Sequence, residues 1–249
     1  MFVALLAVHI SDGILDWPWL ALGFVVAALL LAWSSAKVPD CEIPRIGLIT
    51  AAFFVASLIH VRAGPTSVHL LLNGLAGIIL GRRSALAIGV GLCLQAILLG
   101  HGGFWTLGVN CCIITLPALI AGPVFRRLTH SEEYPSFRFR DGLLAFAYIL
   151  HPSLMLPMLL FVVAGIRAQW RWHEDIDFQA GFVVGFGCVI LTAILNAVVL
   201  VVAGTEDWRM VAMFVVAVHI PIAFIEGIVV GCTASFLRRV KPEMLSPFP

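Results

Sequence analysis

The sequence predicts an all-α integral membrane protein, a polytopic bundle of seven or eight transmembrane helices. Composition is the first observation behind this prediction: of 249 residues, 61% are hydrophobic and 12% are charged, with a mean hydropathy of +1.05. Soluble domains are about 45–50% apolar and about 25% charged, so this chain cannot present a polar surface to water. The second observation is that its long apolar runs do not alternate apolar and polar residues, as the strands of a membrane barrel do. We therefore expect the runs to be helices.

Eight apolar stretches follow one another along the chain, and we expect them to form one transmembrane domain over residues 1–249. A helical span needs about 20 apolar residues, so the third and fourth stretches are short for a full crossing. The stretches lie at 17–33, 47–62, 67–80, 85–99, 109–125, 141–165, 178–202 and 208–238.

The basic residues of the loops predict the orientation, because cytoplasmic loops of membrane proteins are rich in lysine and arginine. With the N-terminus outside and eight spans, nine basic residues lie inside and six outside, and the basic tail FLRRVK (236–241) falls outside. Seven spans would place this tail inside. We therefore expect one stretch not to be a simple crossing, and the loop 126–140, with four arginines, to be cytoplasmic.

Composition also argues against several function classes. The net charge of +1 gives no signature of nucleic-acid binding. Neither lysine, Lys37 or Lys241, follows a glycine as in a Walker A loop, so ATP-driven work would need a partner ATPase. The cysteines form no CxxC pair and mostly lie in apolar runs, so we expect buried thiols and no disulfide framework. They are Cys41, Cys93, Cys111, Cys112, Cys188 and Cys232.

Two further patterns occur inside the apolar stretches. Three GxxxG motifs, Gly77–Gly81, Gly181–Gly185 and Gly227–Gly231, allow close approach of helix backbones, which we expect within the bundle more than at a partner interface. Polar residues inside membrane helices are costly, and they mark interhelical hydrogen bonds or a functional site. Two of them, His219 and Glu226, are seven residues apart and share one helix face. The full set is Asn73, Gln95, Asn110, His151, Asn196, His219 and Glu226.

Three histidines sit at or near the ends of predicted spans. His9 lies in VHISDGIL, His69 in GPTSVHLLLNGLAG and His101 in LLGHGGFWTLGVN. With the N-terminus outside, all three come to the outer face, where Asp12 adds a carboxylate. Neutral imidazole is a ligand for nickel, cobalt, copper and zinc. From the residues alone, a metal site and a structural role between helices both stay open.

Four motifs resemble those of the CbiM/NikM proteins. HISDGIL (9–15) is similar to the HIPDG-type opening of that family, and GPTSVHLLLNGLAGIILG (64–81) is similar to its second signature. CLQAILLGHGGFWTLGVN (93–110) and HIPIAFIEGIVVGCTASFLRRVKPEML (219–245) resemble its third signature and its last helix. The resemblance covers nearly the whole chain, with the motifs in the same order. It implies the substrate-binding membrane component of an energy-coupling-factor (ECF) transporter for cobalt or nickel.

The resemblance also implies a ligand set of four nitrogens. In the family these are the α-amine of the mature N-terminus, the amide and imidazole of the following histidine, and the histidine of the SVH motif. Mapped here, His9 supplies the amide and the imidazole, His69 supplies the fourth nitrogen, and the amine belongs to Val8. Four nitrogens in one plane favour Ni(II) or Cu(II) over harder ions, and Co(II) binds more weakly. The residues we expect to orient the imidazoles are Asp12, Ser67, His101 and Asn110.

The N-terminus departs from the family pattern, which opens with Met-His. Val8 stands at the methionine's position, and MFVALLA precedes it. That segment is shorter than a signal peptide and has no basic residue ahead of its apolar part. We expect translation to start at codon 8, since valine codons such as GTG can initiate and are then read as methionine.

The partners implied by the resemblance are a coupling membrane protein (CbiQ/NikQ-like), a pair of ABC ATPases (CbiO/NikO-like) and a small helper membrane protein (CbiN/NikN-like). We expect a multi-pass protein of a bacterial or archaeal plasma membrane, N-terminus outside, which captures Ni(II) or Co(II) and uses no organic cofactor. We expect no enzyme activity and no nucleic-acid partner. The alternatives are an integral-membrane metalloenzyme using His9, His69 and His101, with Asp12 as its base, and a non-catalytic helical assembly protein. The SVHLLLNG form resembles the nickel branch, while the residues themselves leave nickel and cobalt open.

Overall fold

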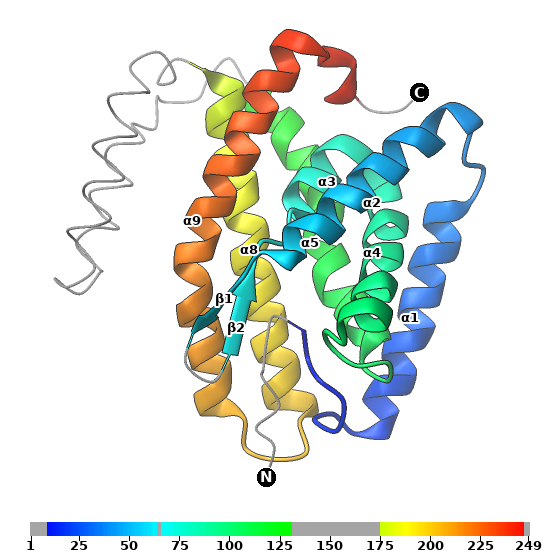
Figure 1. Ribbon diagram of the computed structural model, residues 1–249, viewed down its shortest axis with the longest axis vertical. Helices are drawn as coiled ribbons and strands as arrows, with labels where there is room; N and C mark the ends of the chain where they lie inside the picture. Colours follow the sequence, from blue (N-terminus) through cyan, green and yellow to red (C-terminus); the bar gives the residue numbers. More distant parts are fainter. Residues whose placement is uncertain (1–8, 64–65, 131–174, 247–249) are drawn as a thin grey trace, which may run out of the picture.

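The computed structural model describes residues 9–63, 66–130 and 175–246 of the chain. The predicted stretch 141–165 and His151 lie outside the described residues. Within them the protein is a bundle of helices whose axes run roughly along one direction (Figure 1). Six stretches of the described part are long and apolar enough to cross a membrane. They are Trp17–Ser35, Asp40–Leu58, Asn73–Leu99, Leu107–Thr129, Ile176–Ala203 and Arg209–Val240.

The helical fold class is confirmed, with one addition that the sequence did not predict. Residues at the start of the stretch 67–80 form a short antiparallel hairpin, in which His60 pairs with His69 and Val61 with Val68. Valine and threonine favour extended backbone, and both occur in these strands. In chain order the elements are α1 (Trp17–Ser35), η1 (Asp40–Glu42), α2 (Ile43–Leu58), β1 (His60–Ala63), β2 (Thr66–His69), α3 (Asn73–Leu80), η2 (Gly81–Arg83), α4 (Ser84–Leu99), α5 (Leu107–His130), α8 (Ile176–Ala203), α9 (Arg209–Val240) and η3 (Pro242–Met244).

Helix α3 spans only part of the bundle. It has eight residues, which at about 1.5 Å per residue is about 12 Å, against a hydrocarbon core of about 30 Å. It begins in the middle of the bundle, where Asn73 Nδ2 donates to the Ile114 carbonyl at 3.1 Å. It then follows α5 in the same direction, because a Cβ on Gly77 would meet the Ala118 carbonyl one turn further along α5.

The chain reverses between α3 and α4. Gly81 has a positive φ of 54°, and the turn lies beside the end of α1, where Arg83 Nη1 donates to the Ala36 carbonyl at 2.8 Å. Helix α4 then returns along α1, so that a Cβ on Gly89 would meet Leu31. The short stretches 67–80 and 85–99 therefore form a half-helix and a return helix.

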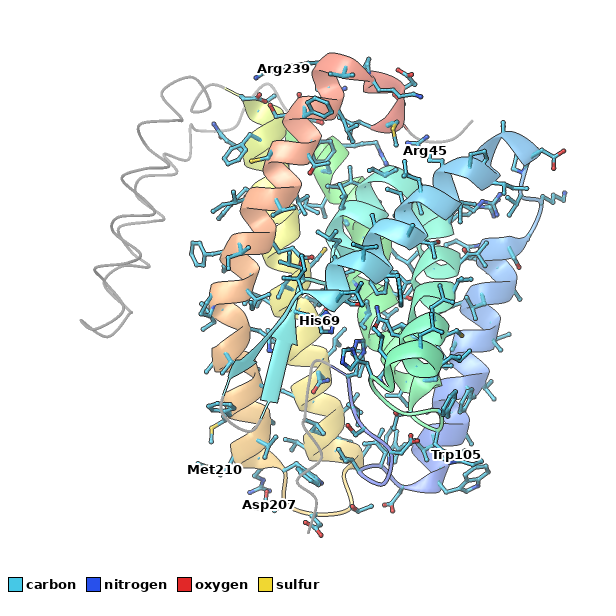
Figure 2. The ribbon with its side chains drawn as sticks, in the orientation of Figure 1. Arg45, His69, Trp105, Asp207, Met210 and Arg239 are labelled. Carbon is cyan, nitrogen blue, oxygen red and sulfur yellow. The ribbon has the colours of Figure 1, made fainter. Side chains whose placement is uncertain are left out.

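Most basic residues of the described helices lie at one end of the bundle, whereas Arg209 lies at the other. Figure 2 shows Arg45 and Arg239 at this end, and Asp207 and Met210 at the opposite one. Helix α9 is anchored to the start of α8 there, since Arg238 Nη2 lies 2.8 Å from Asp177 Oδ1 and Arg239 Nη2 lies 2.9 Å from Asp175 Oδ2. We call this the basic end. The tail FLRRVK therefore lies opposite to the start of α1, as the seven-span alternative requires and the eight-span alternative does not.

The glycine motifs pack inside the bundle, as predicted. A Cβ on Gly181 of α8 would lie 2.8 Å from the Cα of Gly231 on α9, and one on Gly227 would lie 2.9 Å from the Phe182 ring. Helices α8 and α9 consequently run side by side along their length (Figure 1). All six cysteines are free thiols, but the expectation that they are buried holds only for Cys111 and Cys188, and Cys93 is exposed although it lies in an apolar run.

A buried ion pair holds the basic end together, and its loss should destabilise the protein. Arg83 Nε lies 2.9 Å from Glu42 Oε2, with only 3% and 5% of the two side chains exposed. Replacing Glu42 by alanine leaves a buried guanidinium without its counter-charge, which costs about 3–5 kcal/mol. We expect a clearly lower apparent melting temperature in detergent, followed by intrinsic fluorescence.

The control for this prediction is Asp207→Ala. The Asp207–Arg209 pair is 3.8 Å apart with both side chains more than three-quarters exposed, and such pairs contribute about 0–1 kcal/mol. Equal melting temperatures for the Glu42 variant and the unaltered protein would contradict the proposed role of the buried pair.

Candidate metal centre

The N-terminal segment that carries His9 lies inside the bundle and is held by α5. The amide N–H of Ile10 donates to Asn110 Oδ1 at 2.9 Å, and Asn110 Nδ2 donates to the Ile10 carbonyl at 2.9 Å. The Thr106 hydroxyl donates to the same carbonyl at 2.7 Å. The side-chain amide of Asn110 therefore bonds both the N–H and the carbonyl of Ile10, as the backbone of a neighbouring β-strand would. This contact fixes the backbone beside His9, whose side chain is 1% exposed.

Asp12 ties the N-terminal segment to the loop before α5. Its carboxylate accepts hydrogen bonds from three consecutive backbone N–H groups, those of Phe104, Trp105 and Thr106, at 3.0–3.1 Å. Gly103 makes this approach possible, because a Cβ there would lie 1.9 Å from Asp12 Oδ1. The first and third motifs, HISDG and GHGGFWT, therefore contact each other and together hold the N-terminal segment against the loop before α5.

His69 faces His9 at the end of β2. The Nε2 atoms of the two rings are 3.1 Å apart, and both residues are almost completely buried. His69 Nδ1 lies 3.0 Å from the carbonyl oxygen of Leu70. Because a carbonyl only accepts, this contact places a proton on Nδ1 and leaves the Nε2 lone pair for a ligand. In Figure 2 His69 lies in the middle of the bundle.

The remaining predicted residues take different positions around this pair. The ring of His101 stacks on that of His69 with a centroid separation of 6.4 Å and an interplanar angle of 5°. Ser67 lies two residues before His69 in β2 and pairs with Arg62 of β1. Asp12 and Asn110 contact backbone groups in the hydrogen bonds described, so they orient the segment that carries His9 rather than an imidazole directly. Val8 lies outside the described residues.

The spacing of the two imidazoles suits adjacent ligands of one ion. A nitrogen ligand lies about 2.0–2.1 Å from a zinc-sized ion, so two of them at right angles or tetrahedral angles are about 2.8–3.4 Å apart. The separation of 3.1 Å between His9 and His69 falls in this range. Among the described residues, no three His, Cys, Asp or Glu side chains are placed to hold an ion together. A full coordination sphere would need other donors, such as backbone nitrogens, an amine or water.

Burial keeps His9 in the form that binds metals. Burial, followed by the neighbouring His69 and His101, lowers the pKa of His9 well below its ordinary value of 6.5. The imidazole is therefore neutral at physiological pH, and neutral imidazole is the form that coordinates metal ions.

Two residues near the metal centre, Gln95 and Glu226, were identified from the sequence as costly polar residues in apolar helices, but they were not assigned to the centre. Gln95 of α4 is completely buried, and its backbone carbonyl accepts a hydrogen bond from the His101 N–H at 3.2 Å. Glu226 of α9 accepts a hydrogen bond from the Leu71 amide, two residues beyond His69. Thr106 was missed altogether. The cost of a polar residue in an apolar helix flagged the first two, whereas a threonine at a helix start carries no such signal.

Comparison with known proteins gives the family. The model of a family described as the cobalt uptake substrate-specific transmembrane region, CbiM, matches residues 9–244. The chain belongs to this family. A protein of Haemophilus influenzae whose name assigns it to metal transport is 31% identical over 96% of this CbiM-family chain and 97% of its own length. The cobalt transport protein CbiM of Geobacter sulfurreducens is 29% identical over 96% of the chain and 62% of its own length.

Two further comparisons bear on the fold and on partners. The crystal structure of a truncated transition metal transporter superposes on 93% of the CbiM-family chain with a TM-score of 0.64 and 16% identity. At this identity it supports the fold alone. A relative from Methanocorpusculum labreanum is named as a putative fused cobalt transport protein CbiMQ. It is 23% identical over 95% of this chain, and the match covers 36% of the relative's own length.

Loss of the Asn110 clamp should weaken metal binding. We expect Asn110→Ala to release the Ile10 peptide and to lower the affinity for Ni(II) at least about 10-fold, as is found when residues that orient metal ligands are removed. Thr129→Ala is the control on the same helix, since within the described residues the Thr129 hydroxyl bonds to the α5 backbone near the basic end. Equal affinities of the two variants, measured by equilibrium dialysis, would show that Asn110 does not serve the metal centre.

Proposed function

We propose that this CbiM-family protein is the metal-capturing membrane component of an ECF-type transporter that imports Ni(II) or Co(II). The observation that carries the proposal is that two buried imidazoles, those of His9 and His69, stack on each other inside the bundle with ring centroids 5.1 Å apart. The family description supplies the substrate class, because it names a cobalt uptake region.

In the proposed site, His9 contributes its imidazole and its backbone amide nitrogen, and His69 contributes Nε2. An α-amine at Val8 would complete four nitrogens if translation starts there. A chelate ring that includes the amide of His9 closes through Nδ1 of the same residue, so the His9 ring would turn from the position in which its Nε2 faces His69. Nitrogen donors in this arrangement favour Ni(II), and Co(II) follows at lower affinity.

We place the metal centre on the side open to the cell exterior and the basic end in the cytoplasm. Support comes from charge: Arg82, Arg83 and Arg126 line one cavity at that end together with Lys37, and cytoplasmic loops are rich in such residues. The protein would be a multi-pass component of a bacterial or archaeal plasma membrane. Arg126 and Arg127 would contact lipid phosphates or partner subunits.

The proposed partners are a CbiQ-like coupling protein, CbiO-like ATPases and a CbiN-like helper. The name of the fused CbiMQ relative supports the first of these. The chain has no Walker A sequence of its own, so the ATPases would supply the energy. The metalloenzyme alternative is not favoured, since the carboxylate of Asp12, its candidate base, is occupied by three backbone N–H groups.

Cellular uptake tests this proposal. Cells that express the chain with its coupling protein and ATPases should accumulate radioactive nickel or cobalt, and the uptake should stop when the Walker A lysine of the ATPase is replaced. Accumulation that persists without an active ATPase would refute the ECF assignment, and an assay with both metals would rank the two substrates.

Metal binding should weaken as pH falls, because protons compete with the metal for its nitrogen donors. The pKa of His9 lies well below 6.5, so its imidazole contributes little to this dependence above that pH. In the proposed site the amide nitrogen of His9 and the α-amine must each lose a proton to bind, so we expect Ni(II) affinity to decrease continuously from pH 7.5 to 6.5 and below, measured by equilibrium dialysis. Folding stability should decrease in the same direction, because the unfolded chain takes up a proton at His9 near pH 6.5 while the folded chain does not. An affinity that does not change over this pH range would contradict this expectation.

A further inference from the structure

Glu226 of α9 reaches the peptide that follows His69. Its side chain is completely buried, and Oε2 accepts a hydrogen bond from the Leu71 N–H at 2.8 Å. The two partners are 155 residues apart in sequence, so the contact joins the last helix of the chain to the link between β2 and α3.

The local backbone explains why an acceptor is needed there. Leu72 adopts a positive φ of 51°, and the Leu71 N–H lies two residues before Asn73, the first residue of α3. This N–H belongs to neither a strand nor a helix, and there is no bulk water inside a membrane to accept its hydrogen bond. Helix α9 supplies the acceptor through Glu226.

The same peptide connects Glu226 to the imidazole of His69. The peptide unit between Leu70 and Leu71 carries the Leu70 carbonyl on one side and the Leu71 N–H on the other, in one plane. His69 Nδ1 donates to that carbonyl at 3.0 Å, and the N–H donates to Glu226 at 2.8 Å. The order is therefore imidazole, peptide, carboxylate. Hydrogen bonds in such a chain polarise and strengthen one another.

We propose that Glu226 is a positioning residue of the metal centre, which acts on His69 through the Leu70–Leu71 peptide. The inference rests on the proposed function, since it concerns the same metal site. Metal-binding histidines commonly donate their second ring nitrogen to a carboxylate or a carbonyl, which fixes the tautomer and the direction of the ring. Here a carbonyl and a carboxylate both take part, because His69 donates to the Leu70 carbonyl and the N–H of the same peptide donates to Glu226. Glu226 holds the peptide, the peptide keeps the proton on Nδ1, and Nε2 faces His9 with its lone pair.

The first part of the test needs no metal. Nitrogen NMR of the full-length protein in detergent, with labelled histidine and with His69 assigned by comparison with His69→Ala, reports which ring nitrogen carries the proton. We expect the proton of His69 on Nδ1 in the unaltered protein and a mixture of tautomers in Glu226→Leu. A proton on Nε2 in the unaltered protein would overturn the inference.

The second part measures Ni(II) affinity of the same protein by equilibrium dialysis. Glu226→Leu removes the acceptor and should weaken binding about 10–100-fold. Glu226→Gln keeps an oxygen for the Leu71 N–H and should therefore retain most of the affinity. This second variant also allows the test to be made if the leucine variant does not fold. The control is Thr233→Val on α9, whose hydroxyl bonds only to the Val229 carbonyl, and it should bind as the unaltered protein does.

The outcomes separate the two proposals. Binding by Glu226→Leu that equals that of the Thr233 control, with His69 unchanged in the NMR spectrum, overturns the positioning role and leaves the proposed function intact. Where the leucine variant does not fold, a folded Glu226→Gln protein that loses Ni(II) binding overturns the positioning role instead. Absence of Ni(II) and Co(II) binding in the unaltered protein refutes the proposed function, and the tautomer of His69 then decides the positioning role by itself.

Discussion

Replacement of His69 by alanine is expected to abolish tight Ni(II) binding while the protein remains folded. The substitution removes the nitrogen that lies 3.1 Å from His9 Nε2, and it leaves the Asn110 and Asp12 contacts of the N-terminal segment in place. Because a direct ligand is lost, we expect a decrease in affinity greater than the 10–100-fold that follows from removing an orienting residue. Isothermal titration of purified protein, with elution from a sizing column as the folding check, measures the effect.

Two comparisons sharpen this expectation. His9→Ala should have the same effect as His69→Ala, and the double variant should be no weaker, since either loss removes the shared site. His101→Ala should be milder, because the His101 ring stacks on His69 at a centroid distance of 6.4 Å rather than facing His9. Unchanged binding in both the His9 and His69 variants would remove the basis of the site.

The second large effect is expected at the N-terminus. A chain that begins with methionine in place of Val8, without residues 1–7, should bind Ni(II) at least about 100-fold more tightly than one that keeps Met1–Ala7, a difference of about 2.8 kcal/mol. The reason is that only the shorter chain carries an α-amine beside His9, where amine, amide and imidazole form fused chelate rings. Titration of both purified chains measures the difference.

The mass of the N-terminal peptide from the native source accompanies this experiment. A mass that begins at residue 8 supports initiation at the valine codon, and a mass that includes Met1–Ala7 would contradict the α-amine ligand for this chain. Equal affinities of the short and long chains would show that the α-amine is not a ligand.

The sequence predicted the helical fold because hydropathy is a local property that each stretch carries by itself. It also indicated that the stretches at 67–80 and 85–99 were too short for two crossings. It could not show what they form instead. The answer depends on contacts of Asn73 with α5 and of Arg83 with the end of α1, which no local pattern encodes.

The candidate site, like the fold, could be predicted from the sequence only in part. The cost of histidines in apolar surroundings, together with motif resemblance, marked His9, His69 and His101, and the structure brings these three together. Asp12 and Asn110 were expected to orient imidazoles, and they instead hold backbone around His9. Glu226 was recognised as a costly buried carboxylate, but its target is a backbone N–H 155 residues away. Backbone groups are identical at every position, so a sequence does not reveal which one a side chain meets.

We propose that His9 and His69 jointly bind one transition metal ion, and X-ray absorption of the Ni(II)-loaded protein tests this. We expect one nickel per chain, surrounded by nitrogen, with the multiple-scattering signature of two imidazoles that falls to one in His69→Ala. A spectrum dominated by sulfur or by oxygen, or one that is unchanged in His69→Ala, would contradict it.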